Sequence, residues 1–251
     1  MNFKNSVRGK LTALLVALAS ALAVVVGAPQ ASAANRDWLR PDSTGMCEWD
    51  RVAYWVQRCT VWSPAMNRHI TMQIQPAKNG GNAGLYMLDG LRATEITNAW
   101  VNDVNAARTF KDNNITLVMP VGGESSFYSD WQRESNGKHY MWETFLTKEL
   151  IPVLNNEFRS NGKRAVVGLY MGGTAAMNLA ERNPHLFNFV GSFSGYLDTT
   201  TTGMPTAIKA AQLDAGVHPC ELGRAVAGEA RRSWEPPAGA EHVGHPAAEA
   251  V

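Results

Sequence analysis

Short apolar runs alternate with longer amphipathic stretches between residues 39 and 193, and this alternation is the strongest structural signal in the chain. Residues 70–75 alternate with a period of two, which predicts a strand with one face toward solvent. Runs 85–88, 115–119 and 165–167 are short and apolar except for Thr116, and each is followed by a turn residue. Such runs are typical of buried strands in a largely parallel sheet.

Two longer stretches predict helices. Residues 141–158 place apolar side chains at near-helical spacing, with Pro152 as the site of an expected kink. Residues 171–182 are rich in Ala, Met and Leu, and Asn183-Pro184 ends this helix. Because strands alternate with helices, we predict an α/β sandwich with helices on both faces of the sheet.

The start of the chain differs from this middle part. A basic opening precedes an apolar run at residues 11–26, and residues 31–33 are Ala-Ser-Ala, the pattern of a signal-peptidase site. We therefore expect a signal peptide at 1–33, cleaved after Ala33, and a secreted or cell-envelope protein. An uncleaved anchor is the alternative, but the run is shorter than the roughly 20 residues that cross a bilayer.

The end of the chain loses the pattern as well. Residues 34–216 form the predicted domain, whereas 217–251 are rich in Ala, Gly and Pro and show no strand or core helix. This segment is either a flexible tail or a stretch outside the ancestral reading frame. The abrupt change near Gly216 favours the second interpretation.

Composition and charge narrow the class of protein. With 45% hydrophobic and 18% charged residues, the 251-residue chain is not disordered, collagenous or coiled-coil, and it can build one large core. The formal charge of +1 gives no reason to expect nucleic acid. Without residues 1–33, which hold three basic and no acidic groups, 20 basic and 22 acidic residues remain, formally −2.

Export changes the interpretation of the cysteines. In an oxidising compartment Cys47 and Cys59 are a natural disulfide pair, and the alternative is two buried thiols; Cys220 is left over. No His or acidic pair clusters with them at metal-ligand spacing. We expect no metal, nucleotide or redox cofactor.

Two turns carry candidate chemistry. Residues 168–172, Gly-Leu-Tyr-Met-Gly, follow a predicted strand and open a predicted helix, where α/β hydrolases place the G-x-S-x-G turn of a serine nucleophile. Here Tyr170 takes the nucleophile position, and an ordinary Gly-rich turn is the alternative. Residues 88–92, Leu-Asp-Gly-Leu-Arg, also end a strand and can supply an oxyanion-hole amide, or form a plain Asp-Gly turn.

With two further segments, at 119–131 and 142–146, these turns resemble the secreted mycolyltransferases of the antigen 85 type, in the same order along the chain. The resemblance covers roughly residues 47–216. It implies an α/β-hydrolase fold and the transfer of mycolyl groups between trehalose monomycolates, or to arabinogalactan, through an acyl-serine. The implied partners are trehalose mycolate-type glycolipids or cell-wall glycan. The fibronectin binding of some members is not carried over to this chain.

The resemblance also assigns roles to individual residues. It implies that Leu91 and Met171 supply the two oxyanion-hole amides. It places four residues in contact with the substrate: Asp89, Leu91, Arg92 and Asp198. For Arg92 and Asp198 the alternative is a solvated surface pair.

Departures from the family pattern predict a loss of activity. Tyr170 is bulkier than serine, and a phenol has a pKa near 10, so it does not replace a hydroxymethyl group. The family's acid and histidine are expected after Gly216, and neither His242 nor His245 has a matching motif, so the domain reads as truncated at its C-terminal side. Loss of triad members costs a factor of about 10⁴ to 10⁶ in turnover.

We expect three other polar residues to have no part in the chemistry. We expect His139 and His185 to be surface or structural residues and Ser194 to end a strand. Two alternatives to an inactive family member remain. One is a non-catalytic binder of trehalose glycolipids with Tyr170 stacked on the sugar. The other is a chain that does not fold stably because a sheet edge is exposed.

Overall fold

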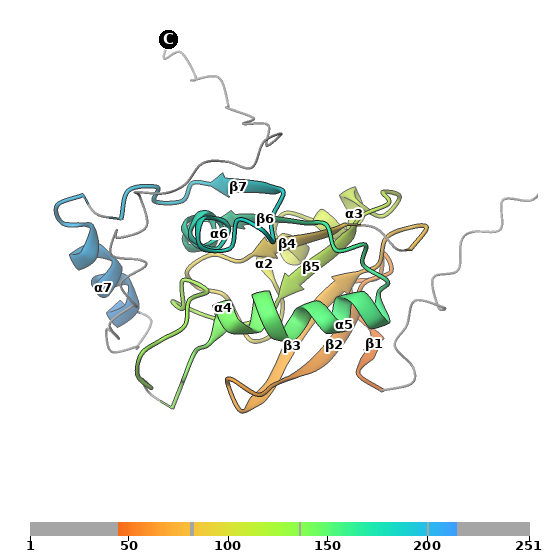
Figure 1. Cartoon of the computed structure of the whole chain (residues 1–251), viewed down its shortest axis with the longest axis horizontal. Coiled ribbons are helices and arrows are strands. Elements are labelled where there is room, and N and C mark those ends of the chain that lie inside the picture. Colours follow the sequence, from red (N-terminus) through yellow and green to blue (C-terminus); the bar gives the residue numbers. More distant parts are fainter. Residues whose placement is uncertain (1–44, 81–82, 136, 200, 215–251) are drawn as a thin grey trace, which may run out of the picture. The chain divides into compact units, whose positions relative to one another are not determined.

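A seven-stranded mixed sheet forms the centre of the protein (Figure 1). The computed structural model describes residues 45–80, 83–135, 137–199 and 201–214. The strand order is β1-β2-β3-β5-β4-β6-β7, and β2, β5, β4, β6 and β7 run in one direction. The elements are β1 Cys47–Trp49, β2 Gln57–Ser63, β3 Arg68–Gln75, β4 Gly84–Leu88, α2 Ala99–Asn102, α3 Ala106–Thr109, β5 Thr116–Pro120, α4 Trp142–Thr144, the π-helical turn η2 Phe145–Glu149, α5 Leu150–Glu157, β6 Arg164–Leu169, α6 Met171–Arg182, β7 Phe189–Phe193 and α7 Met204–Asp214.

Alternate side chains of the central strands pack into two hydrophobic cores, one on each face of the sheet. On β4, Tyr86 and Leu88 pack with α5 and α6, whereas Leu85 and Met87 pack with α2 and α3. This is the period-two geometry of a strand buried on both faces. The α/β sandwich with a largely parallel sheet is therefore confirmed. Strands β4 and β6 cover the apolar runs that predicted them, and β5 lies one residue later than its run.

The prediction of a solvent-facing side for residues 70–75 is wrong. In β3, Gln73 is 1% exposed and Gln75 is 0% exposed. Both amides are buried because they satisfy backbone groups: Gln73 Oε1 accepts from the Asn98 amide at 2.9 Å, and Gln75 Nε2 donates to the Ala107 carbonyl at 2.7 Å. The polar side of the strand thus fastens the α2–α3 segment to the sheet.

The helical predictions are confirmed in different degrees. Helix α6 spans the predicted residues, Met171–Arg182, and Asn183 caps its C-terminal end. Along 141–158 the chain forms α4, η2 and α5, so the departure from α-helical geometry is a π-helical turn that precedes Pro152. Proline has no amide hydrogen and crowds the carbonyl four residues earlier, and a wider turn relieves both problems.

The first two strands were not predicted, and a disulfide joins them. Cys47 and Cys59 face each other in the β1–β2 register and are bonded, as predicted.

No helix in the described ranges is long and apolar enough to cross a membrane. The predicted signal peptide, the predicted domain boundaries near 33 and 216, Cys220 and the segment 217–251 lie outside the described residues.

Candidate functional site

Tyr170 occupies a sharp turn between β6 and α6. Its backbone angles, φ 48° and ψ −113°, are unusual for a residue with a side chain. The Tyr170 amide donates to the Phe193 carbonyl at 2.8 Å, and the Tyr170 carbonyl accepts from the Thr174 amide at 3.1 Å. The turn is therefore fixed through main-chain atoms, while the tyrosine side chain is 61% exposed.

Glycines around this turn allow backbones to touch. A Cβ atom on Gly172 would overlap the Asp89 and Leu88 carbonyls, and one on Gly168 would overlap the Gly172 carbonyl. These neighbours are main-chain atoms of β4 and α6, which cannot swing aside. The glycine spacing thus has a steric cause: it lets α6 start directly against the end of β4.

A cavity of about 660 Å³ opens beside the turn. The loop after β4 forms one wall of the cavity, and Tyr170 and Met171 form a second wall. Helix α7 contributes a third wall, which is apolar. The lining residues are Asp89, Gly90, Leu91, Arg92, Ala99, Asp103, Val104, Phe127, Leu169, Tyr170, Met171, Tyr196, Met204, Ala207, Ile208 and Ala211.

The two amides expected to bind an oxyanion, those of Leu91 and Met171, belong to residues that line this cavity. Met171 is the first residue of α6, so its N–H has no carbonyl partner within the helix. The N-terminal end of a twelve-residue helix also carries partial positive charge. This side of the cavity is suited to an anion or a polarised carbonyl oxygen.

Asp89 holds the loop rather than presenting a free carboxylate. Its side chain accepts from the Gly90 amide at 2.6 Å and the Ala99 amide at 2.9 Å, and the residue is 4% exposed. Burial raises the pKa of the Asp89 carboxyl, and these two hydrogen bonds act against that rise. Asp89 therefore joins the loop after β4 to the start of α2.

Hydrogen bonds from the segment 119–131 hold the loop after β4 in place. The Tyr128 hydroxyl accepts from the Asp89 amide at 3.0 Å, and the Leu91 carbonyl accepts from the Ser125 amide at 3.0 Å. The Phe127 amide points at the Met171 sulfur, 3.3 Å away. Three of the four sequence segments singled out above thus meet at one place.

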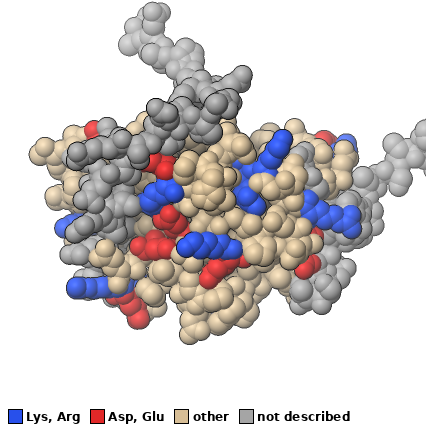
Figure 2. Space-filling model, in the orientation of Figure 1, with Lys and Arg blue, Asp and Glu red and all other residues tan. Residues whose placement is uncertain are grey.

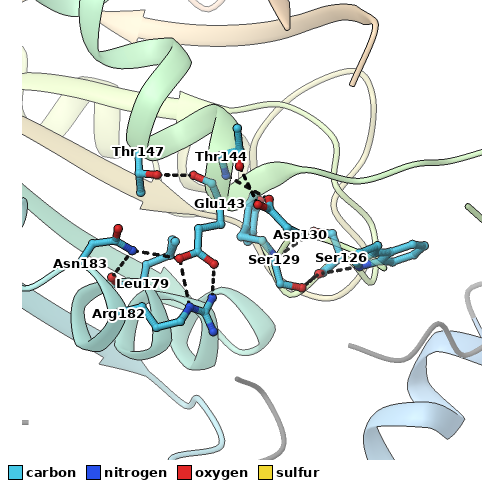
Figure 3. Close-up of polar contacts among 11 residues, drawn as sticks. Ser126, Ser129, Asp130, Glu143, Thr144, Thr147, Leu179, Arg182 and Asn183 are labelled. Carbon is cyan, nitrogen blue, oxygen red and sulfur yellow. Dashed lines mark hydrogen bonds and ion pairs between the residues drawn. The ribbon is translucent and has the colours of Figure 1, made fainter. Parts of the chain in front are cut away.

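The fourth segment, at 142–146, joins the segment 119–131 to α6 (Figure 3). Thr144 donates to Asp130 through both its amide and its hydroxyl, at 3.0 and 2.6 Å. On the other side of α4, Glu143 accepts from Arg182 Nε at 3.0 Å and pairs with its terminal nitrogen at 2.6 Å, and Asn183 adds a further bond at 3.0 Å. Asp130 therefore joins the segment 119–131 to α4, and Glu143 joins α4 to the C-terminal end of α6, the helix that follows the turn at residues 168–172, named here the elbow.

Comparison with known proteins identifies the family. Residues 63–244 match the family described as "Putative esterase". The chain belongs to this esterase family. Within the family it is 40% identical, over 227 residues, to the diacylglycerol acyltransferase/mycolyltransferase Ag85A of Mycobacterium leprae, covering 85% of this chain and 63% of that protein. It is 42% identical, over 167 residues, to Ag85B of Mycolicibacterium smegmatis, covering 64% and 51%. The chain thus spans between half and two thirds of these relatives.

Solved structures agree with this esterase fold. The crystal structure of Mycobacterium tuberculosis MPT51 (FbpC1) is 36% identical, with a TM-score of 0.59, covering 65% of this chain and 60% of that one. An S-formylglutathione hydrolase from Agrobacterium tumefaciens has a TM-score of 0.55 at 18% identity, covering 66% and 70%. The second likeness concerns the fold alone.

Not every residue predicted for the site lies at the cavity. Arg92 is exposed and lines it, but Asp198 is exposed two residues beyond Tyr196 and is not among the lining residues. Ser194 directly follows β7, as predicted, with φ 58°. His139 and His185 are exposed, and no histidine in the described ranges lines the cavity. Those same ranges hold no cluster of three metal-ligand side chains.

Sequence reasoning missed the wall formed by α7. Met204, Ile208 and Ala211 recur at spacings of four and three, which is the signal of one apolar helix face. Tyr196 also lines the cavity and is 58% exposed, but no sequence pattern distinguishes it from its neighbours.

Proposed function

We propose that this chain is an exported member of the mycolyltransferase branch of the esterase family that does not carry out acyl transfer. Membership in the branch is supported by 40% identity to Ag85A and by the four segments of the resemblance, three of which meet at one cavity. The disulfide between Cys47 and Cys59 supports export, because such bonds persist in oxidising compartments.

The residue at the elbow carries the proposal of inactivity. A serine at this turn would hold its oxygen one bond from Cβ, beside the Met171 amide. Tyr170 instead places its oxygen at the far end of an aromatic ring, and the side chain is largely in solvent. In addition, no histidine of the described residues lines the cavity to act as a base. What remains is a turn, two main-chain amides and a cavity without a serine hydroxyl to receive the acyl group.

The test is turnover of a short-chain nitrophenyl ester and of trehalose monomycolate by the purified chain and by Tyr170→Ser. We expect both proteins to stay about 10⁴-fold or more below a serine enzyme, because no histidine of the described residues lies at the cavity to activate the hydroxyl that the variant gains. A serine-enzyme rate in the unmodified chain would overturn the proposal. A gain of that size in Tyr170→Ser alone would show that the substitution silenced an otherwise complete site.

A second candidate function is non-catalytic binding of a trehalose mycolate-type glycolipid or of cell-wall glycan. The cavity favours it: Arg92 offers a bidentate donor at the rim, Tyr170 offers a ring to stack on a sugar, and α7 gives an apolar wall. Calorimetric titration with trehalose tests this function. Saturable heat that Arg92→Ala removes is the expected result, and no heat up to millimolar sugar would exclude it.

A further inference from the structure

A second hollow lies far from the elbow in the sheet, in the loop that joins β1 to β2. It measures about 520 Å³. The residues that line it, named here the aromatic cradle, are Trp49, Asp50, Ala53, Tyr54, Trp55, Val56 and Lys111. Gln75, at this end of β3, pairs with Leu117 near the start of β5, so the cradle lies where the parallel strands begin. The elbow lies where they end.

Three aromatic rings surround this hollow. Trp49 and Trp55 are half-buried and meet edge to face, with ring centroids 6.0 Å apart, and Tyr54 is 37% exposed. Rings that are rigidly held and partly exposed offer flat apolar surface at low entropic cost. Asp50 and Lys111 add a carboxylate and an ammonium group at the same hollow.

The cradle is held in an unfavourable backbone conformation. Ala53, Tyr54 and Trp55 all have positive φ, at 66°, 51° and 66°, although none is glycine. Such residues persist only where the surroundings impose them, and they concentrate at binding sites. Here the surroundings are specific, since the Tyr54 carbonyl accepts from buried Gln75 and the Val56 amide donates to the Ala53 carbonyl at 3.1 Å.

Asp50 completes the frame of the loop. Its carboxylate accepts from the Val52 amide and from Gln73 Nε2, both at 2.9 Å, and lies 3.7 Å from Arg58. The disulfide between Cys47 and Cys59 closes the base of the same hairpin. The rings are therefore preorganised before any ligand arrives, which lowers the entropic cost of binding.

The charges select the class of ligand. An aromatic cage for a quaternary ammonium ion needs a site without competing cations. In this cradle the cation Lys111 lines the hollow and is itself paired with Asp112 at 3.5 Å, and the Asp50 charge is opposed by Arg58 at 3.7 Å, so neither charge is left unopposed to hold an ion. A neutral ligand with one apolar face and polar edges fits better. Sugar rings have that form, since their C–H faces stack on aromatic rings and their hydroxyls accept and donate at the rim.

We propose that the aromatic cradle binds the rings of a neutral saccharide, as a site separate from the elbow cavity. This proposal does not depend on the chemistry at Tyr170. The saccharide can come as a free disaccharide or as part of an extended glycan, because both present the same stacking faces.

The experiment follows the tryptophan indole N–H signals of the full chain by NMR while trehalose or soluble arabinogalactan is added. We expect the signals of Trp49 and Trp55 to shift and that of Trp62 to stay. Trp62 is a matched reference, because it is 47% exposed on β2 but lies outside the cradle. A response to trehalose supports a free-disaccharide ligand, and a response to the polymer alone supports an extended glycan.

Variants separate stacking from folding. Tyr54→Ala removes an exposed ring but keeps the carbonyl that Gln75 binds, and we expect it to weaken binding between about twofold and tenfold. Trp62→Ala should leave the affinity unchanged. The proposal is overturned if neither saccharide shifts Trp49 and Trp55, if tetramethylammonium shifts them and the saccharides do not, or if Trp62→Ala weakens binding as much as Tyr54→Ala.

Discussion

The elbow and the aromatic cradle both hold non-glycine residues at positive φ, but different atoms impose that conformation. At the elbow the main chain does so: Tyr170 bonds through its amide and carbonyl, and glycines let β4 and α6 touch. In the cradle, Tyr54 is held by the buried side chain of Gln75 and the loop is closed by a disulfide.

The difference explains how chemistry can change on a constant frame. The hydrogen bonds of the Tyr170 amide and carbonyl fix the elbow through main-chain atoms, so the turn does not rely on the side chain at this position. In the cradle the side chains themselves form the surface. A substitution of Tyr170 itself therefore changes the exposed side chain and spares the fold, whereas a substitution in the cradle's frame alters both its surface and its fold.

Gly172→Ala should have the largest effect on stability. The added Cβ overlaps two main-chain carbonyls at the end of β4, and we expect the free energy of unfolding to fall by about 3 kcal/mol or more. Urea denaturation measures it. The matched control is Gly162→Ala, where φ is +81° but no atom lies within 4 Å, so the cost is near 1 kcal/mol. Equal losses would show that backbone contact is not what fixes the elbow.

Removal of the disulfide should cost slightly less and act on the other region. Cys47 and Cys59 are separated by 12 residues, and a loop of that size is worth about 3 kcal/mol in the unfolded-chain model. The double variant Cys47→Ala/Cys59→Ala should lower the urea midpoint and make it insensitive to reductant. If reduction leaves the midpoint of the unmodified chain unchanged, hydrogen bonds alone hold the cradle's hairpin.

The smallest effect concerns the pH dependence at Asp89. Because burial raises the pKa of this carboxyl above its ordinary value of 3.8, the folded chain holds the proton more tightly than the unfolded chain. Its stabilising contribution is full below pH 3.8 and is lost as the pH rises through the folded-state pKa. The unfolding free energy of the unmodified chain minus that of Asp89→Asn should therefore decline with rising pH. A difference that grows with pH would contradict this assignment.

Much of the fold could be read from the chain because burial leaves a direct mark on residue pattern. Strands β4, β5 and β6 are apolar on both faces, and α6 has a clear stop at Asn183-Pro184, so each was predicted at or near its true bounds. The polar face of β3 misled that logic. Gln73 and Gln75 look like surface residues in sequence, but they are buried because they bind main-chain groups at the start of α2 and in α3, which lie far away along the chain.

The sequence by itself determined the elbow's glycine pattern, the disulfide pair and the tyrosine at position 170. Only the tertiary structure decided that the Asp89 carboxylate accepts hydrogen bonds from the Gly90 and Ala99 amides. It also decided that α7 forms a wall of the cavity and that three aromatic residues of one hairpin surround a second hollow. The physical reason is range. Periodicity and turn chemistry act between neighbours along the chain, whereas these contacts join segments that no local pattern relates.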